Sequence, residues 1–158
     1  MDEARQSGVY EVNLFFEEAM PKREMPALLS AATVASNLVT DLPEAWANSA
    51  NKFFDTLAAK KPVLLNHGGW MNEIVQRYGC GLAVWQHSLA EVAAELDYKM
   101  HDENWLNEAG EAAGTLAVKF FDRDALAKQL IAVLEAAAKG CPEKAGRIAP
   151  GKYESESL

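Results

Sequence analysis

Short apolar runs alternate with amphipathic segments along the first half of this chain, and this alternation constrains the fold more than any other feature. Four runs rich in β-branched, aromatic or aliphatic residues are expected to be strands: 9–16, 33–39, 62–66 and 81–85. The third run reads PVLLN, which is typical of a short strand buried in a parallel sheet. Strands that alternate with helices indicate βαβ units, so the sequence predicts an α/β fold with a parallel sheet of about four strands.

Apolar residues at helical spacing predict the connecting helices and a helical C-terminal part. The expected helices are 25–32, 50–60, 70–78, 88–100, 103–119 and 122–138. Ser49 is a good N-cap for the second helix, Gly79 is a typical stop for the third, and Asp122 is a candidate cap for the last. No periodicity continues beyond that point, so we expect one domain over residues 1–138 and a mostly irregular tail over 139–158.

The amino-acid composition argues for a globular domain and against several classes of partner and site. The chain has 158 residues, of which 49% are hydrophobic and 24% charged, as in ordinary globular domains. The net charge of −8 argues against nucleic acid as a partner. Cys80 and Cys141 belong to no Cys/His cluster, so no metal site is expected and reduced thiols in the cytoplasm are the simplest interpretation. No apolar run approaches the ~20 residues that span a bilayer, so at most a peripheral membrane contact is expected.

The carboxyl ends of parallel strands are where α/β proteins bind ligands, and two loops are expected there: 40–49 and 66–70. In the first loop and the helix after it, Asn48, Ser49 and Asn51 place polar side chains beside free backbone N–H groups. Lys52 follows in the first helical turn, where a cation opposes the helix dipole unless an anion binds at that end. Simple capping by Ser49 with a solvated Lys52 is an equally consistent interpretation.

The second loop reads NHGGW. Gly68 and Gly69 allow a close backbone approach to a ligand, but they are equally compatible with a simple tight turn. His67 is expected to be a solvated loop residue more often than a catalyst. Trp70, together with Trp46, could stack on a ring of a ligand, although an aromatic residue at a helix start more often belongs to the core.

Two long segments carry a family resemblance: MPKREMPALLSAATVASNLV, and NSANKFFDTLAAKKPVLLNHGGWMNEIVQRYGCGLAV. Taken together, they resemble the C-terminal, donor-binding domain of family 4 glycosyltransferases of the GT-B fold, similar to bacterial amino-sugar transferases of lipopolysaccharide and capsule assembly. The resemblance covers roughly residues 9–138 and rests on the order and spacing of several segments. It implies a partial Rossmann-like sheet and a retaining transfer from a nucleotide-sugar, commonly UDP-linked, with no cofactor or metal.

The resemblance also assigns roles to the residues of both loops. The segment containing Asn48, Ser49, Asn51 and Lys52 would lie beside the donor phosphates and sugar, and the turn at 67–70 would contact the sugar. This placement agrees with the independent argument from the helix dipole.

In the family, two acidic residues eight positions apart serve the donor. The second falls on Asp55, a conservative change expected to face the ribose, whereas the first falls on Ala47, which departs from the family. Glu44 lies three residues earlier and is the candidate replacement, so Glu44 and Lys52 are the expected catalytic residues. Lys60 stands where the family segment LAAGKPV has glycine, which should have local consequences at the helix end.

GT-B enzymes place the acceptor in a separate N-terminal domain, for which this chain has no room, and the first two βα units of the donor domain are also missing. We therefore expect no transferase activity from this polypeptide alone. The strand at 33–39 would expose an open edge unless residues 9–16, a missing N-terminal half or a second copy pairs with it. The alternative function is a non-catalytic α/β interaction module, a degenerate remnant of the enzyme, and a receiver-like or flavodoxin-like domain ranks last.

Overall fold

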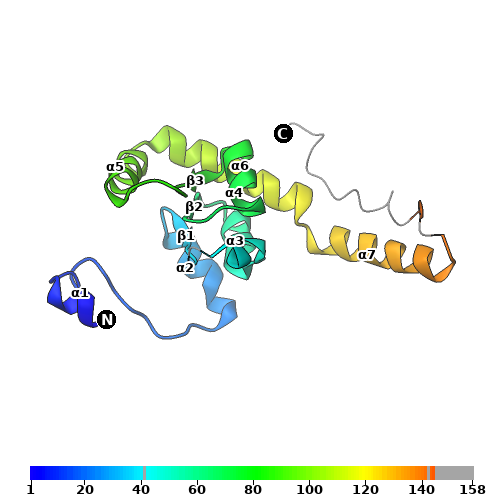
Figure 1. Ribbon diagram of the computed structural model, residues 1–158, viewed down its shortest axis with the longest axis horizontal. Coiled ribbons are helices and arrows are strands. Elements are labelled where there is room, and N and C mark those ends of the chain that lie inside the picture. Colours follow the sequence, from blue (N-terminus) through cyan, green and yellow to red (C-terminus); the bar gives the residue numbers. More distant parts are fainter. Residues whose placement is uncertain (41, 142, 145–158) are drawn as a thin grey trace.

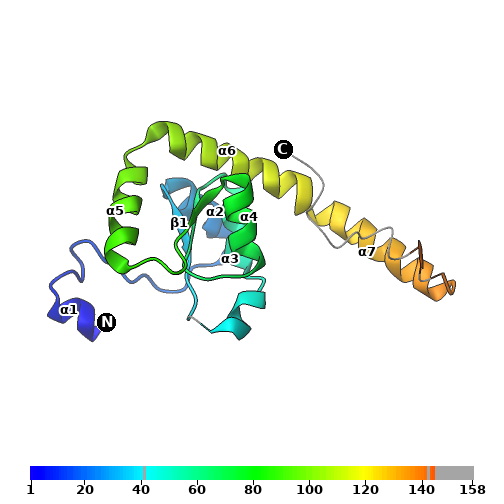
Figure 2. The same ribbon diagram turned by 45° about the horizontal axis from the view of Figure 1, so that its top comes forward.

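The computed structural model describes residues 1–40, 42–141 and 143–144, and it confirms an α/β fold. In chain order the elements are α1 (Asp2–Gln6), η1 (Lys22–Glu24), α2 (Met25–Ala31), β1 (Ala35–Asn37), η2 (Pro43–Ala47), α3 (Asn51–Ala58), β2 (Val63–Leu65), α4 (Trp70–Tyr78), β3 (Gly81–Ala83), α5 (Leu89–Met100), α6 (Glu103–Phe120) and α7 (Arg123–Ala138). The small sheet lies at the centre of the body, while α1 and α7 extend away from it on opposite sides (Figure 1). In the turned view α6 runs across the body and leads directly into α7 (Figure 2).

The sheet has three parallel strands in the order β1-β2-β3, rather than the expected four. Ala35 of β1 pairs with Val63 of β2, and Val63 pairs in turn with Gly81 of β3. The predicted strands at 33–39, 62–66 and 81–85 are therefore present and contiguous, although each is shorter than expected. Among the described residues β1 pairs only with β2, so its other edge is open.

The prediction of a strand at residues 9–16 is wrong. The segment bonds to itself instead of to the sheet: the Leu14 amide donates to the Val9 carbonyl, and the Glu11 amide donates to the Leu14 carbonyl. Glu11 has a φ of 57°, which breaks extended backbone, and the apolar side chain of Phe15 is exposed. A strand forms only where another strand accepts its hydrogen bonds, and this segment does not reach the open edge of β1.

The hydrophobic core lies between the sheet and the helices α3, α4 and α6. Helical spacing creates the packing faces, because residues three and four apart share one side of a helix. The buried cluster comprises Phe53, Leu57, Val63, Leu65, Met71, Ile74, Val75, Tyr78, Cys80, Ala113 and Leu116. None of the helices in the described residues is long and apolar enough to cross a membrane.

Of three helix ends expected from the sequence, the structure confirms two and contradicts one. Gly79 ends α4 in the left-handed conformation with a φ of 63°, and the Asp122 carboxylate caps α7 by accepting from the Ala125 amide, as expected. The prediction for Ser49 is wrong, because α3 begins one residue later than a Ser49 cap requires, and its N-cap residue is Ala50. Most of the expected irregular tail, namely residue 142 and residues 145–158, lies outside the described residues.

The end of α3 packs closely on α6. Lys60 adopts a φ of 55°, a conformation that favours glycine, and its ammonium pairs with the Glu111 carboxylate at 2.9 Å. Gly110 and Gly114 of α6 face Lys60 and leave room for it. Lys60 is therefore accommodated by two glycines on the neighbouring helix.

Burial of Cys80 makes the stability of the fold sensitive to alkaline pH. Loss of hydration in the core raises the pKa of the Cys80 thiol from 9.0 to about 11. Between these values the thiol ionises in the unfolded chain but stays protonated in the folded one, so stability is complete below pH 9 and falls as pH rises towards 11. We expect a loss of about 2 to 3 kcal/mol from this group.

Urea unfolding at several pH values, followed by circular dichroism, measures this loss. The Cys80→Ala variant should show a shallower decline above pH 9, whereas Cys141→Ala, which removes the half-exposed thiol, should follow the unmodified chain. Equal declines in all three proteins would contradict the assignment.

Candidate functional site

The two loops expected to form a site do meet at one edge of the sheet. Residues 38–50 follow β1 and residues 66–69 follow β2, and the strands are parallel, so both loops leave the carboxyl edge. The Asn66 side chain ties them together, since its Oδ1 accepts from the Val39 amide and its Nδ2 donates to the Val39 carbonyl, both at 2.9 Å. The sequence carries a single signal for this pair of hydrogen bonds, an asparagine directly after an apolar strand.

The start of α3 lies on this edge with its first amides uncapped. Ala50 provides no side-chain hydrogen bond, while Asn48 and Ser49 just before the helix are exposed. Asn51 and Lys52 occupy the first turn and are also exposed, and no ion pair of Lys52 exists within the described part of the chain. A cation beside free N–H groups is unfavourable for an isolated helix and favourable for a helix that binds an anion.

The Gly68–Gly69 turn is filled by the chain itself. A methyl group built on Gly68 would lie 3.2 Å from the Trp46 ring, and one on Gly69 would lie 2.7 Å from the Trp46 carbonyl oxygen. Gly69 also has a φ of 90°. The Trp46 ring stands edge-to-face with Trp85, with 4.9 Å between the ring centroids. The two glycines therefore permit a close approach, and η2 makes that approach in this structure.

His67 differs from the expected solvated loop residue, because it is completely buried. Its Nδ1 lies 2.7 Å from the Gly68 carbonyl oxygen, so Nδ1 carries the proton and Nε2 is left as an acceptor. Within the part of the chain that the structure describes, Nε2 has no hydrogen-bond partner, and neither do the buried Asn37 Oδ1 and Trp46 Nε1. Local sequence carries no signal for this burial, which depends on how α4 and η2 cover the loop.

Trp70 lies in an aromatic cluster beneath the site. Its ring stacks on Phe54 with 6.1 Å between centroids and meets the edge of Phe53 at 5.7 Å. Phe121 from the end of α6 completes the cluster. This is the core alternative considered for Trp70, and it anchors the first turn of α4 under the glycine turn.

The two acidic candidates occupy different places. Glu44 is exposed in η2, next to Trp46 on the same short helix. Asp55 is half-buried in α3 and lines a pocket of about 300 Å³ between α2 and α3, whose other walls include the apolar Met25 and Leu29. Asp55 lies four residues after Asn51, so these two side chains share one face of the helix.

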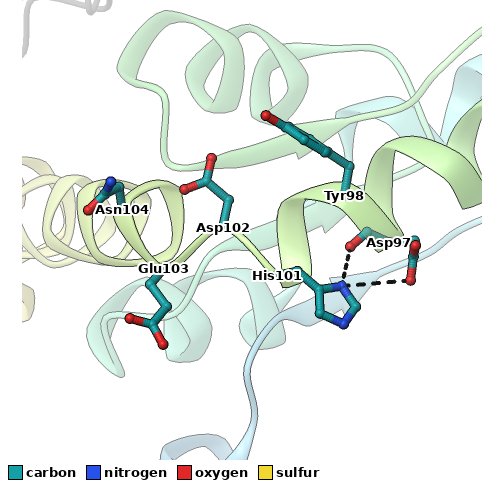
Figure 3. Close-up of a pocket in the computed structure, with 6 residues that line it drawn as sticks. All are labelled: Asp97, Tyr98, His101, Asp102, Glu103 and Asn104. Carbon is teal, nitrogen blue, oxygen red and sulfur yellow. Dashed lines mark hydrogen bonds and ion pairs between the residues drawn. The ribbon is translucent and has the colours of Figure 1, made fainter.

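A second hollow lies at the corner between α5 and α6, away from the carboxyl edge. It is lined by Asp97, Tyr98, His101, Asp102, Glu103 and Asn104. In Figure 3 the His101 ring approaches the Asp97 carboxylate, with 3.8 Å between Nδ1 and Oδ1, and the other side chains point apart. His101 Nδ1 lies 2.7 Å from the Asp97 carbonyl oxygen, and the Asp102 carboxylate caps α6. These contacts give His101 and Asp102 structural roles at the helix ends. No group of metal-ligating side chains occurs among the described residues.

Among the described residues, the carboxyl edge thus combines uncapped helix amides, a lysine without an ion pair and buried polar atoms without hydrogen-bond partners, and it is the strongest candidate site. Comparison with known proteins adds no family: no family model, no curated protein and no solved structure matches the chain significantly, so its function has to be inferred from these residues and their geometry.

Proposed function

We propose that the chain binds a nucleotide-sugar, commonly UDP-linked, at the carboxyl edge of its sheet, as the donor-binding half of a retaining glycosyltransferase of surface polysaccharide or lipopolysaccharide synthesis. One observation carries the proposal: α3 begins at this edge with uncapped amides and with Lys52 exposed and without an ion pair among the described residues. The parallel order β1-β2-β3 supports a partial Rossmann-like sheet, on which nucleotides bind at this edge.

In this proposal the start of α3 binds the diphosphate. The amides and the Lys52 ammonium would stabilise the negative charge that develops on the departing nucleotide diphosphate, which is an oxyanion-type effect. Asn48, Ser49 and Asn51 would add neutral hydrogen bonds to the phosphates and sugar. Asp55, one turn further along the face of Asn51, would accept hydrogen bonds from the ribose hydroxyls.

Glu44 is the proposed second catalytic residue, because η2 holds it at the same edge and leaves it exposed to a bound donor. The acceptor and the rest of the cleft would come from a partner, either an N-terminal half or another copy. We accordingly expect no turnover from the chain alone.

Replacing Lys52 with alanine separates binding from folding. UDP affinity should fall about tenfold, because one charge-assisted contact to phosphate is lost. The free energy of unfolding should instead rise by about 0.3 to 1 kcal/mol, because a cation is removed from the helix N-terminus. Calorimetric titration with UDP and urea unfolding of the same samples measure both effects.

The matched control is Lys128→Ala, which removes an exposed lysine of α7 and should change neither quantity appreciably. The wild-type affinity should also weaken as salt is raised, since the contact is electrostatic and exposed. Equal UDP affinity in the Lys52→Ala variant and the wild type would refute the phosphate site.

The alternative function, an interaction module without catalysis, is favoured by a different observation. Large apolar side chains of α7 are exposed, among them Leu130 and Leu134, and the helix extends away from the body (Figures 1 and 2). Exposed apolar side chains on α7 and an unpaired strand edge at β1 are both features that a protein partner would cover. Absence of UDP binding, combined with self-association in sedimentation velocity, would favour this alternative.

A further inference from the structure

Two buried hydrogen-bond acceptors near the carboxyl edge find no donor among the described residues. Asn37, at the end of β1, is 1% exposed and its Oδ1 is unpartnered; His67, after β2, is 0% exposed and its Nε2 is unpartnered. Buried polar atoms are almost always paired, because an unpaired one costs about 1 to 3 kcal/mol. An unpaired acceptor at the ligand-binding edge of a parallel sheet therefore indicates that a bound ligand supplies the donor.

The two acceptors belong to one region of the molecule. Asn37 is paired in register with Leu65, and His67 follows Leu65 by two residues. The first turn of α4 contacts both: Asn37 Nδ2 lies 3.6 Å from Met71 Sδ, and Asn72 Nδ2 donates to the His67 carbonyl at 3.0 Å. The first turn of α4 thus holds both residues in place, while Asn37 Oδ1 and His67 Nε2 keep no hydrogen-bond partner among the described residues.

Trp46 of η2 covers the glycine turn that directly follows His67. Its ring fills the space above Gly68, its carbonyl approaches Gly69, and its own Nε1–H is buried without an acceptor among the described residues. A tryptophan that leaves its only donor unpaired is held there by apolar packing against Trp85 and the glycine turn. Trp46 belongs to a short 3-10 helix with no side-chain cap, so its position depends on this packing and on no side-chain hydrogen bond at the helix start.

We infer that Trp46 is a displaceable plug over a polar subsite formed by Asn37 and His67, and that this subsite accepts hydroxyl groups of the sugar carried by the nucleotide. The inference rests on the proposed nucleotide-sugar function. It adds a binding subsite for the sugar and a residue, Trp46, that has to move before the sugar binds. Both unpartnered atoms are acceptors, so they match a ligand rich in O–H donors and disfavour a phosphate. The diphosphate and the sugar then take separate positions, the first at the start of α3 and the second under Trp46.

Chemical modification of histidine tests the plug without any ligand. The chain has three histidines, of which His87 and His101 are exposed and serve as internal references. Diethyl pyrocarbonate should modify His67 far more slowly than these two in the wild type. In Trp46→Ala the rate at His67 should rise at least tenfold, whereas Trp46→Phe, which keeps a ring over the turn, should stay close to the wild type. Mass spectrometry of peptides measures all three rates in each sample.

Titration with UDP and with UDP-N-acetylglucosamine tests the subsite in the same variants. In Trp46→Ala the sugar nucleotide should bind at least fivefold more tightly than UDP, and adding His67→Ala should abolish this difference while UDP affinity is retained. Circular dichroism and thermal unfolding establish that each variant is folded, and Trp46→Leu, which removes the ring but keeps an apolar side chain, replaces Trp46→Ala should that variant unfold.

Each failure has its own meaning. An unchanged His67 rate in a folded Trp46→Ala variant would overturn the plug. Equal affinity for UDP and the sugar nucleotide in that variant would overturn the subsite and leave the phosphate site standing. Absence of binding of either ligand to every variant would overturn the proposed function and the assignment of a sugar to the subsite with it.

Discussion

Replacing Gly81 with alanine is expected to cost at least about 4 kcal/mol of folding free energy, a large part of the about 5 to 15 kcal/mol that stabilises an ordinary domain. Gly81 lies in β3 directly opposite Val63 of β2. A methyl group there would collide with the Val63 carbonyl oxygen and would stand 2.6 Å from the Val63 nitrogen. Strand β3 cannot retreat, because the Val63 amide donates to the Cys80 carbonyl and the Val84 amide donates to Leu65. Urea unfolding followed by circular dichroism measures the loss.

The control for this variant is Gly79→Ala, two residues earlier. Gly79 has a φ of 63° but no atom within 4 Å of the added methyl group. Its substitution should therefore cost only about 1 to 2 kcal/mol, the penalty of a left-handed residue. A Gly81→Ala protein as stable as Gly79→Ala would show that the two strands separate more easily than their hydrogen bonds indicate.

The difference between predicted and observed strands has a physical cause. Residues 62–66 and 81–85 were placed correctly because a buried parallel strand needs a continuous apolar run, which is visible locally. Residues 9–16 have a similar composition, yet they form a turn that leaves Phe15 and Phe16 exposed. Strand pairing is a long-range event, and composition alone does not reveal whether a partner edge is within reach.

Helices were more predictable than strands, since their hydrogen bonds are local. Gly79 ends α4, and Asp122 begins α7, at the residues that the sequence indicates. Ser49 does not cap α3, because a capping residue lies directly before the first turn and α3 begins at Asn51. The consequence reaches the candidate site, because a helix without a side-chain cap keeps its first amides free for a ligand.

The sequence predicts which loops meet at the candidate site, but it does not predict that Trp46 occupies the space over the glycine turn. The order of the elements was sufficient to bring the loop before α3 and the Gly68–Gly69 turn to one edge. Whether the space over two glycines holds a ligand or a side chain depends on a contact across more than 20 residues, here from Trp46 (68 − 46 = 22). The burial of His67 depends on the same contact region and was likewise beyond local pattern.

Replacing Gly110 with alanine should destabilise the fold, although alanine is intrinsically the better helix former by about 1 kcal/mol. A methyl group on Gly110 would lie 2.7 Å from the Lys60 carbonyl oxygen. That oxygen is part of a backbone held by the bond from the Lys60 amide to the Leu57 carbonyl at 3.0 Å, so α3 and α6 would have to separate. We expect a net loss of about 1 to 3 kcal/mol from overpacking, measured by urea unfolding.

Gly114→Ala is the matched comparison one turn along the same helix. The added methyl group would also lie 2.7 Å from Lys60, but from its Cγ, and this side chain is largely exposed and free to change rotamer. The helix-forming gain of alanine should then roughly offset the weakened pair between Lys60 and Glu111, which is worth at most about 1 kcal/mol at a surface. Equal losses in the two variants would mean that the side chain, and not the backbone of Lys60, sets the distance between α3 and α6.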